Sequence, residues 1–219
     1  MQKAKIVAVL NTKGGVGKST TAVNVAAELS RSGERVLFVD GDNQASAYGA
    51  LTLRADSGLQ PIAAVSCPEG KVMRQQVQLQ LENYDRIIID AGGKDSTSLR
   101  AALMLADVVL IPCQPSSFDI WGTGDMVTLI RQANEQRDGL VCYAFLSVAD
   151  TIPNSRDNAD SLTQLREFPE LIVLDTPLSH RKAYPRAASF GMSVFETVPA
   201  HERDSKAMAE LAALMAVLN

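Results

Sequence analysis

The stretch from residue 11 to residue 20, Asn-Thr-Lys-Gly-Gly-Val-Gly-Lys-Ser-Thr, constrains the fold more than any other part of the chain. It follows the apolar run Ile6–Leu10, which is typical of a strand covered on both faces, and it precedes a segment of helical composition. Three glycines within four positions let backbone N–H groups turn inward around an anion, and the helix N-terminus adds its own free N–H groups. We therefore predict a phosphate-binding loop between the first strand and the first helix.

Individual side chains of this stretch suit a nucleoside triphosphate and its metal ion. Lys18 can reach the β- and γ-phosphates, the Ser19 hydroxyl suits a Mg²⁺ ligand, and Thr20 can bond the α-phosphate. A glycine-rich turn that merely precedes a helix is the alternative, but Gly-Lys-Ser between a strand and a helix favours phosphate binding. The predicted cradle also contains Lys13, Gly14, Gly15, Val16 and Gly17.

Further apolar runs alternate with helical segments along the rest of the chain. Strands are expected at residues 36–40, 86–90 and 108–112, with weaker candidates at 140–147 and 171–174. Helices are expected at residues 19–32, 71–83, 96–106, 119–136, 154–167 and 203–218. This alternation predicts an α/β fold of the P-loop NTPase type, with a mainly parallel twisted sheet and helices on both faces. No linker or internal repeat interrupts it, so a single domain over residues 1–219 is expected.

Composition excludes several other classes of protein. With 46% apolar and 21% charged residues the chain can bury a large core, and no apolar run is long enough to span a membrane. The early first strand leaves no room for a signal peptide. Three scattered cysteines without a Cys-x-x-Cys pair argue against disulfides or a zinc ribbon and favour a reducing cytoplasm. The net charge of −4 requires that any contact with nucleic acid come from a local basic patch.

A second lysine in the phosphate loop is the most specific feature. Thr12 replaces the first glycine of the usual G-x-x-x-x-G-K-[ST] pattern, and Lys13 stands five residues before Lys18. This K-G-G-x-G-K-[ST] form, the deviant Walker A motif, resembles the ParA/MinD family of dimeric ATPases over essentially the whole chain. The resemblance implies a Mg²⁺-dependent, slow ATPase that forms a homodimer with ATP, in which Lys13 reaches the partner's phosphates. The alternative is a solvated loop cation.

Three carboxylates match positions of the same family. Asp40 and Asp42 follow the second strand candidate and resemble the family's D-x-D-P-Q segment, which implies that Asp40 acts around the magnesium ion and Asp42 positions the attacking water. Ordinary turn residues are the alternative there, and Asn43 replaces the usual proline. Asp90 ends the run of residues 86–90 and matches the Walker B acid, which implies a metal role shared with Ser19. The following Ala-Gly-Gly-Lys departs from the family's usual Thr-Pro-Pro type of switch II.

The residues that contact adenine are harder to identify from the sequence than those that bind phosphate. Pro177 and Leu178 lie in a region that resembles the family's base-flanking segment and are apolar enough to sandwich a purine, although a plain loop explains them almost equally well. Where relatives often carry asparagine after the sixth strand, this chain has Ser147.

The biological role implied by the resemblance is partition or positioning of DNA, as in the small ParA proteins without an N-terminal helix-turn-helix. The protein would be cytoplasmic, associated with the nucleoid when ATP-bound, and stimulated by a ParB-like or adaptor protein. A membrane role is not expected, because residues 207–219 contain no basic residue. Two alternatives stay open: a positioning ATPase for a non-DNA protein cargo, and a small-molecule kinase or synthetase. Candidate DNA contacts, which a normally charged solvated face explains equally well, are Arg181, Lys182, Arg186, Arg203 and Lys206.

Overall fold

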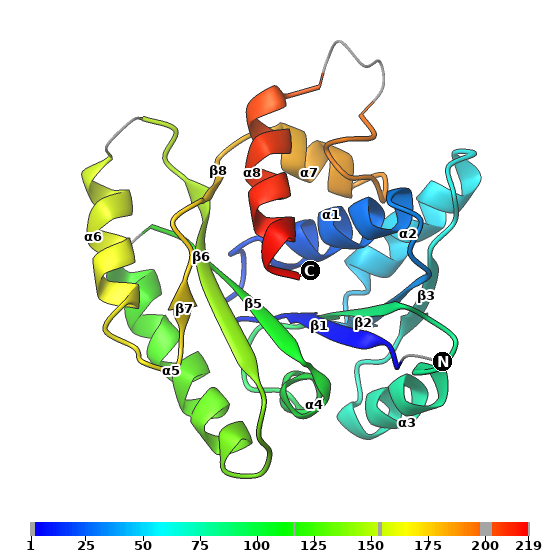
Figure 1. Ribbon diagram of the computed structural model, residues 1–219, viewed down its shortest axis with the longest axis horizontal. Coiled ribbons are helices and arrows are strands. Elements are labelled where there is room, and N and C mark those ends of the chain that lie inside the picture. The colour runs from blue at the N-terminus through cyan, green and yellow to red at the C-terminus, as the bar shows by residue number, and fades with distance from the viewer. Residues whose placement is uncertain (1–2, 116, 153–154, 198–202, 219) are drawn as a thin grey trace.

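An eight-stranded parallel sheet forms the centre of the protein (Figure 1). The computed structural model describes residues 3–115, 117–152, 155–197 and 203–218. Seven strands follow the order β3-β2-β4-β1-β5-β6-β7, and β8 pairs with the end of β6. All of these pairings are parallel. The strands are β1 (Lys5–Val9), β2 (Val36–Gly41), β3 (Ala63–Ser66), β4 (Arg86–Ala91), β5 (Val108–Cys113), β6 (Val141–Ala149), β7 (Ile172–Val173) and β8 (Leu178–Ser179).

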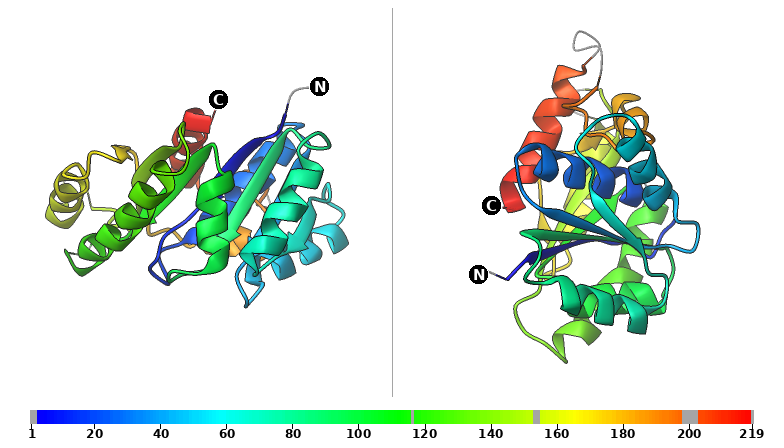
Figure 2. Two further views of the ribbon diagram at one scale, coloured as in Figure 1. Left: turned by 90° about the horizontal axis from the view of Figure 1, so that it is seen from below. Right: turned by 90° about the vertical axis from the view of Figure 1, so that its right-hand side faces the viewer.

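Helices cover both faces of this sheet, as Figures 1 and 2 show. One face carries α1 (Lys18–Arg31), α2 (Ser46–Asp56), α7 (Ala183–Ala188), α8 (Ser205–Met215) and its 3₁₀ extension η2 (Ala216–Leu218). The other face carries α3 (Gly70–Gln80), α4 (Thr97–Leu105), α5 (Ser117–Asn134) and α6 (Arg156–Leu165). Each layer has its own apolar core, so strands that face both cores must be apolar throughout. The predicted α/β architecture is confirmed.

The register of the central strands brings the predicted carboxylates to one edge. Asp40 at the end of β2 lies directly opposite Asp90 at the end of β4. The neighbouring strand β1 aligns Val9 with Asp90, and the glycine-rich loop leaves the sheet one residue later. Ligands of open α/β sheets bind at this carboxyl edge, so the order β2-β4-β1 places the loop beside both acids.

Four short elements were not expected from the sequence. Helix α2 buries Ala47, Ala50, Leu51 and Arg54, a helical spacing hidden by two alanines and a charge. Strand β3 is a half-exposed edge strand without a strong β-branched run, β8 has two residues, and α7 has six residues that include a proline. The other predicted elements are present with ends shifted by a few residues; residue 154, the expected start of a helix, lies outside the described residues.

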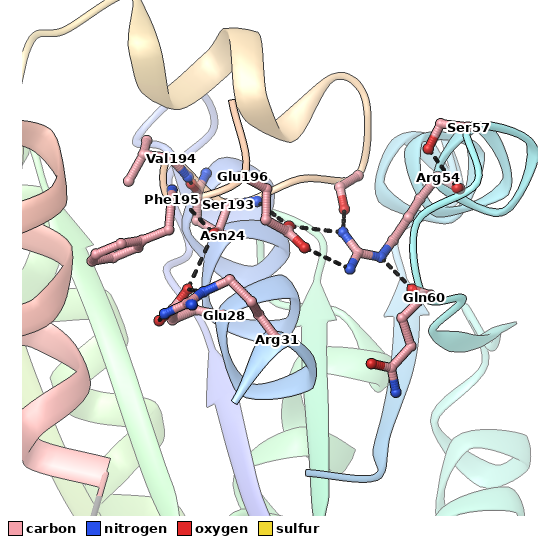
Figure 3. A network of polar contacts seen from close by, with 11 residues as sticks. Asn24, Glu28, Arg31, Arg54, Ser57, Gln60, Ser193, Val194, Phe195 and Glu196 are labelled. Atoms are coloured by element: carbon pink, nitrogen blue, oxygen red, sulfur yellow. Dashed lines mark hydrogen bonds and ion pairs between the residues drawn. The ribbon is translucent and has the colours of Figure 1, made fainter. Parts of the chain in front are cut away.

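A polar network joins α1, which follows the glycine-rich loop, to α2, which follows β2 (Figure 3). The Arg54 guanidinium of α2 makes two hydrogen bonds of 2.8 Å to Glu196, and it also donates to the Gln60 and Gly191 carbonyls. Asn24 of α1 donates to the Thr20 carbonyl at 2.8 Å and accepts from the Val194 amide at 3.0 Å. The segment around residues 191–196 therefore ties α1 to α2 on one face of the sheet.

Two expectations from composition agree with the structure. The three cysteines, Cys67, Cys113 and Cys142, are free and buried. Among the described residues, no helix is both long and apolar enough to cross a membrane.

Candidate nucleotide-phosphate site

The glycine-rich loop forms an open anion cradle at the start of α1. Gly15 and Gly17 have φ angles of 78° and 85°, a left-handed backbone that side chains with a Cβ rarely adopt. Gly17 is the N-cap residue of α1, which has no side-chain cap and no acidic residue in its first turn. The first N–H groups of α1 and its positive dipole end are therefore available to an anion.

Polar side chains from three strands hold this cradle in shape. Asn11 is buried; its Nδ2 donates to the Pro112 carbonyl at 2.9 Å, and its Oδ1 accepts from the Lys13 amide at 3.0 Å. Ser147 Oγ of β6 donates to the Val16 carbonyl at 2.6 Å. After β5, Gln114 Nε2 donates to the Gly15 carbonyl at 2.9 Å. Sequence reasoning missed these supports; their only signal was a polar residue at the carboxyl end of an apolar strand.

Lys18 lies at the bottom of the cradle. Its side chain is buried, and Nζ donates to the Lys13 carbonyl at 2.7 Å. Burial lowers the pKa of Lys18, while the nearby Asp90 and Asp42 carboxylates raise it. A phosphate that enters the cradle would stabilise the charged form of Lys18, because it would replace the water that burial removed from the ammonium.

Asp40 uses both of its carboxylate oxygens on backbone N–H groups. Oδ1 accepts from the Asp42 amide at 3.0 Å, and Oδ2 accepts from the Tyr48 amide at 2.9 Å. Burial raises the pKa of Asp40, and these two amides lower it. The carboxylate therefore shapes the turn that carries Asp42 and anchors the start of α2. A role of Asp40 around a metal ion stays a prediction.

Asp90 is the buried polar group with the fewest protein partners in the site. Asp90 is 1% exposed, and among the described residues neither of its carboxylate oxygens has a hydrogen-bond partner. The Ser19 hydroxyl is near enough to affect its pKa, but it makes no hydrogen bond of acceptable geometry with the carboxylate. Burial raises the pKa of Asp90 to about 7, with Ser19 and Lys18 acting in the opposite direction.

A divalent cation fits this arrangement. A buried carboxylate without a partner is costly, and a metal ion or its bound water would satisfy it. Among the described residues, no three His, Cys, Asp or Glu side chains gather as a metal cluster. Mg²⁺ does not need one, because it keeps several waters and binds through one or two protein oxygens and substrate phosphates. The Ser19 hydroxyl and the Asp90 carboxylate are the groups that would hold it.

The segment after β4 packs tightly against both the cradle and Asp42. A Cβ on Gly92 would lie 3.1 Å from Asp42 Oδ2, and one on Gly93 would lie 3.3 Å from the Gly14 amide nitrogen. Asp42 Oδ1 accepts from the Gln44 amide at 2.9 Å, which orients its carboxylate. The Ala-Gly-Gly sequence suits this close packing, because a side chain at Gly92 or Gly93 would force the neighbouring atoms to shift by a few tenths of an ångström.

A cavity of about 310 Å³ lies beside the cradle, between the loop and β8. Its wall includes Leu178, Thr20, Val148 and His180, but Pro177 is not among the residues that line it. The size and largely apolar lining suit a nucleoside. A base contact of Leu178 stays a prediction, and the geometry gives Pro177 no part in this cavity.

The five predicted DNA contacts do not share one environment. Arg181 has its guanidinium committed to Glu210, with Nε 3.0 Å and Nη2 2.9 Å from Oε1, and Asp204 lies 3.8 Å away. This pairing fastens α8 to the end of β8 and neutralises most of the charge that a DNA phosphate would need. Arg203 donates to the Thr197 carbonyl at 3.0 Å. The side chains of Lys182, Arg186, Arg203 and Lys206 are exposed.

Comparison with known proteins agrees with this geometry. A family profile described as "AAA domain" matches residues 4–80 and 55–141, which together make up more than half of the chain. The chain is 31% identical over 198 residues to maintenance of carboxysome distribution protein A of Halothiobacillus neapolitanus, covering 89% of this chain and 88% of that protein. It is also 31% identical over 191 residues to Protein ParA of Rhizobium radiobacter, covering 85% and 83%.

The chain belongs to the ParA/MinD family. The predicted resemblance, which rested on Lys13 and Lys18, is thereby confirmed. Among solved structures, the ATP complex of Cyanothece McdA superposes with a TM-score of 0.75 at 19% identity, covering 98% of this chain and 97% of the other. Membership of the ParA/MinD family accounts for the fold and for the position of the phosphate loop.

Proposed function

We propose that this protein is a Mg²⁺-dependent ATPase that dimerises with ATP and partitions or positions DNA. The proposal that the protein binds ATP rests on three groups of the site. They are the uncapped start of α1, the buried Lys18 ammonium, and the Asp90 carboxylate, which has no hydrogen-bond partner among the described residues. Triphosphate oxygens satisfy the first two, and Mg²⁺ would satisfy the third. The ATP complex of the McdA neighbour supports the choice of nucleotide.

Hydrolysis follows from the groups around the terminal phosphate. Asp42 holds an attacking water in line with the γ-phosphorus. The water oxygen bonds to phosphorus, the bond to the ADP oxygen breaks, and a proton of the water passes to the released phosphate. Lys18 stabilises charge on the phosphate oxygens, and Lys13 does so from the partner subunit. When bound, Mg²⁺ neutralises charge on the β- and γ-phosphates. Because Lys13 acts across the dimer, turnover depends on dimerisation and is slow without a stimulating partner protein.

DNA binding is assigned to exposed cations near α7 and α8. Lys182 and Lys206 are the exposed lysines among the predicted contacts, and a dimer would present each of them twice. Because ATP drives dimerisation, doubling this weakly basic patch makes the affinity for DNA depend on ATP. The monomer itself need not be basic, in agreement with its net charge of −4. Similarity to a chromosome-partitioning ATPase, Soj of Thermus thermophilus, at 31% identity over 160 residues supports a partition role. This role would place the protein in the cytoplasm, on the nucleoid when ATP is bound.

A non-DNA protein cargo is the second candidate. It is favoured by the pairing of Arg181 with Glu210, which weakens the basic patch, and by the relative named for carboxysome distribution. In that case ATP would still drive dimerisation, but the surface of α7 and α8 would bind a protein adaptor.

The deciding experiment measures binding of the purified protein to arbitrary duplex DNA in ADP and in ATP, at two salt concentrations. Binding that needs ATP, weakens with salt and ignores sequence supports DNA partition. Lys182→Glu with Lys206→Glu should abolish it, whereas Lys71→Glu with Arg74→Glu on α3, across the sheet, should not. The Lys18→Ala protein should lose the ATP dependence. ATP-dependent dimerisation without DNA binding would favour the protein cargo.

A further inference from the structure

Lys94 has a backbone conformation that residues with a side chain rarely adopt. Its φ angle is 74°, in the left-handed region where glycine and asparagine are tolerated best. The Lys94 amide donates to the Thr12 carbonyl at 2.5 Å, so this conformation is tied to the phosphate loop. A lysine in such a position is strained, and strain of this kind clusters at functional sites.

The Lys94 side chain lines a cavity of about 610 Å³ together with Lys13. The cavity lies between the phosphate loop, the segment after β4 and helix α5, and Lys13 lies against Gly122 of that helix. Within the part of the chain that the structure describes, the Lys94 ammonium has no ion pair or hydrogen bond. The adjacent acid, Asp95, is already taken by Arg100 at 2.6 Å. Two lysines thus line one cavity beside the loop, which Arg100, Asp95 and Asp125 also line.

This cavity is separate from the nucleoside cavity. Gly15, Gly17 and Thr20 line the nucleoside cavity, whereas Thr12 and Lys13 line the lysine cavity, and the two share no lining residue. The subunit's own nucleoside therefore does not occupy the lysine cavity. The lysine cavity is therefore free to receive an anion carried by a second subunit.

We propose that Lys94 is a second cation that acts with Lys13 on the terminal phosphate of the ATP bound to the partner subunit. This proposal rests on the proposed ATP-dependent dimer. Charge spreads over the γ-phosphate oxygens during transfer, and cations fixed beside them stabilise that state more than the ground state. Lys94 would therefore raise the rate of hydrolysis and leave the affinity for ATP nearly unchanged. A lysine is kept at a strained position because its charge is used.

The first test separates the charge of Lys94 from its backbone conformation. Lys94→Asn and Lys94→Gly both tolerate a positive φ and lack the charge, whereas Lys94→Arg keeps the charge and the strain. We expect the first two to fold and bind ATP like the wild type, with turnover about 10- to 100-fold lower. We expect Lys94→Arg to keep most of the turnover. Wild-type turnover in Lys94→Asn or Lys94→Gly would overturn the proposal.

The second test asks whether Lys94 acts across the dimer. Lys94→Asn protein is mixed with Asp42→Ala protein, which lacks the water-positioning carboxylate but keeps Lys94. In mixed dimers only the nucleotide held by the Lys94→Asn subunit has Asp42 on its own side and Lys94 on the partner's side. An equal mixture should then recover about a quarter of wild-type turnover, since half of the dimers are mixed and each has one complete site. No recovery would overturn the proposal.

The same assays distinguish this proposal from the proposed function. If the wild-type protein does not hydrolyse ATP, the proposed function fails and this inference fails with it. If the wild type hydrolyses ATP and Lys94→Asn does so equally well, only the role of Lys94 is overturned.

Discussion

The ion pair between Arg54 and Glu196 offers the sharpest test of how the segment around residues 191–196 is held. The Arg54 and Glu196 side chains are 1% and 8% exposed, and two hydrogen bonds of 2.8 Å join them. Removing one member of a buried pair costs about 3–5 kcal/mol, because the other charge stays buried without its partner. Glu196→Ala leaves Arg54 with the Gln60 and Gly191 carbonyls. We therefore expect the lower end, a loss of about 3 kcal/mol in the free energy of unfolding.

Urea denaturation at pH 7, followed by circular dichroism, would measure this loss as a lower midpoint with an unchanged slope. For a chain of this length about 3 kcal/mol corresponds to a fall of about 6–12 °C in Tm. Asp85→Ala, which removes an exposed ion pair with Arg35, is the matched control and should change the midpoint far less. The effect of Glu196→Ala should also change little with added salt, because a buried pair is poorly screened.

Two results would refute this reasoning. A loss below about 1 kcal/mol in Glu196→Ala would mean that the segment is not held by the pair. The double change Arg54→Met with Glu196→Leu replaces the pair by apolar side chains and should restore most of the stability. If the double variant is less stable than Glu196→Ala, the hydrogen bonds of Arg54 to the two carbonyls, and not its charge, hold α2 in place.

Three further predictions concern the site. Lys13→Gln should keep ATP affinity and lose most of the ATP turnover, measured as phosphate release; unchanged turnover would exclude action across the dimer. Gly92→Ala should lower turnover by about 10-fold, because its Cβ would lie 3.1 Å from Asp42 Oδ2, whereas Gly49→Ala, with nothing within 4 Å of its Cβ, should not. In metal-free protein the pKa of Asp90 is about 7 against an ordinary 3.8, so the folded state binds the proton more tightly than the unfolded state. Stability should therefore fall as pH rises from about 4 to 7, by up to about 4 kcal/mol, and Asp90→Asn should flatten that slope in urea titrations with EDTA.

The phosphate loop and the central strands could be predicted because their signals are local. Residues 6–10 and 87–89 are apolar at every position, as expected of strands covered on both faces. Lys13 and Lys18 frame a Lys-Gly-Gly-Val-Gly-Lys segment that can be read directly from the sequence. By contrast, α2 gives a weak signal, because its buried stripe contains alanines and the charged Arg54.

Long-range contacts explain what sequence reasoning missed in the site. Nothing near Arg181 in the sequence reveals that Glu210 neutralises it, because the partner lies 29 residues away on α8. In the same way Ser147 supports the Val16 carbonyl across 131 residues. The close approach of Gly92 to Asp42 depends on the pairing of two strands that are separated in sequence. Such roles become visible only when the fold places the elements together.

The supports of the phosphate loop also set an order for events during synthesis of the chain. Residues 11–20 leave the ribosome early, yet Asn11 is held by the Pro112 carbonyl and the Val16 carbonyl by Ser147. Strand β1 must first find its neighbours β4 and β5, and pairings this distant in sequence form slowly. A nascent chain therefore exposes its phosphate-binding residues long before it can bind a nucleotide. Competence to bind should arise only after residue 147 has emerged, late in translation, when Lys18 is already buried.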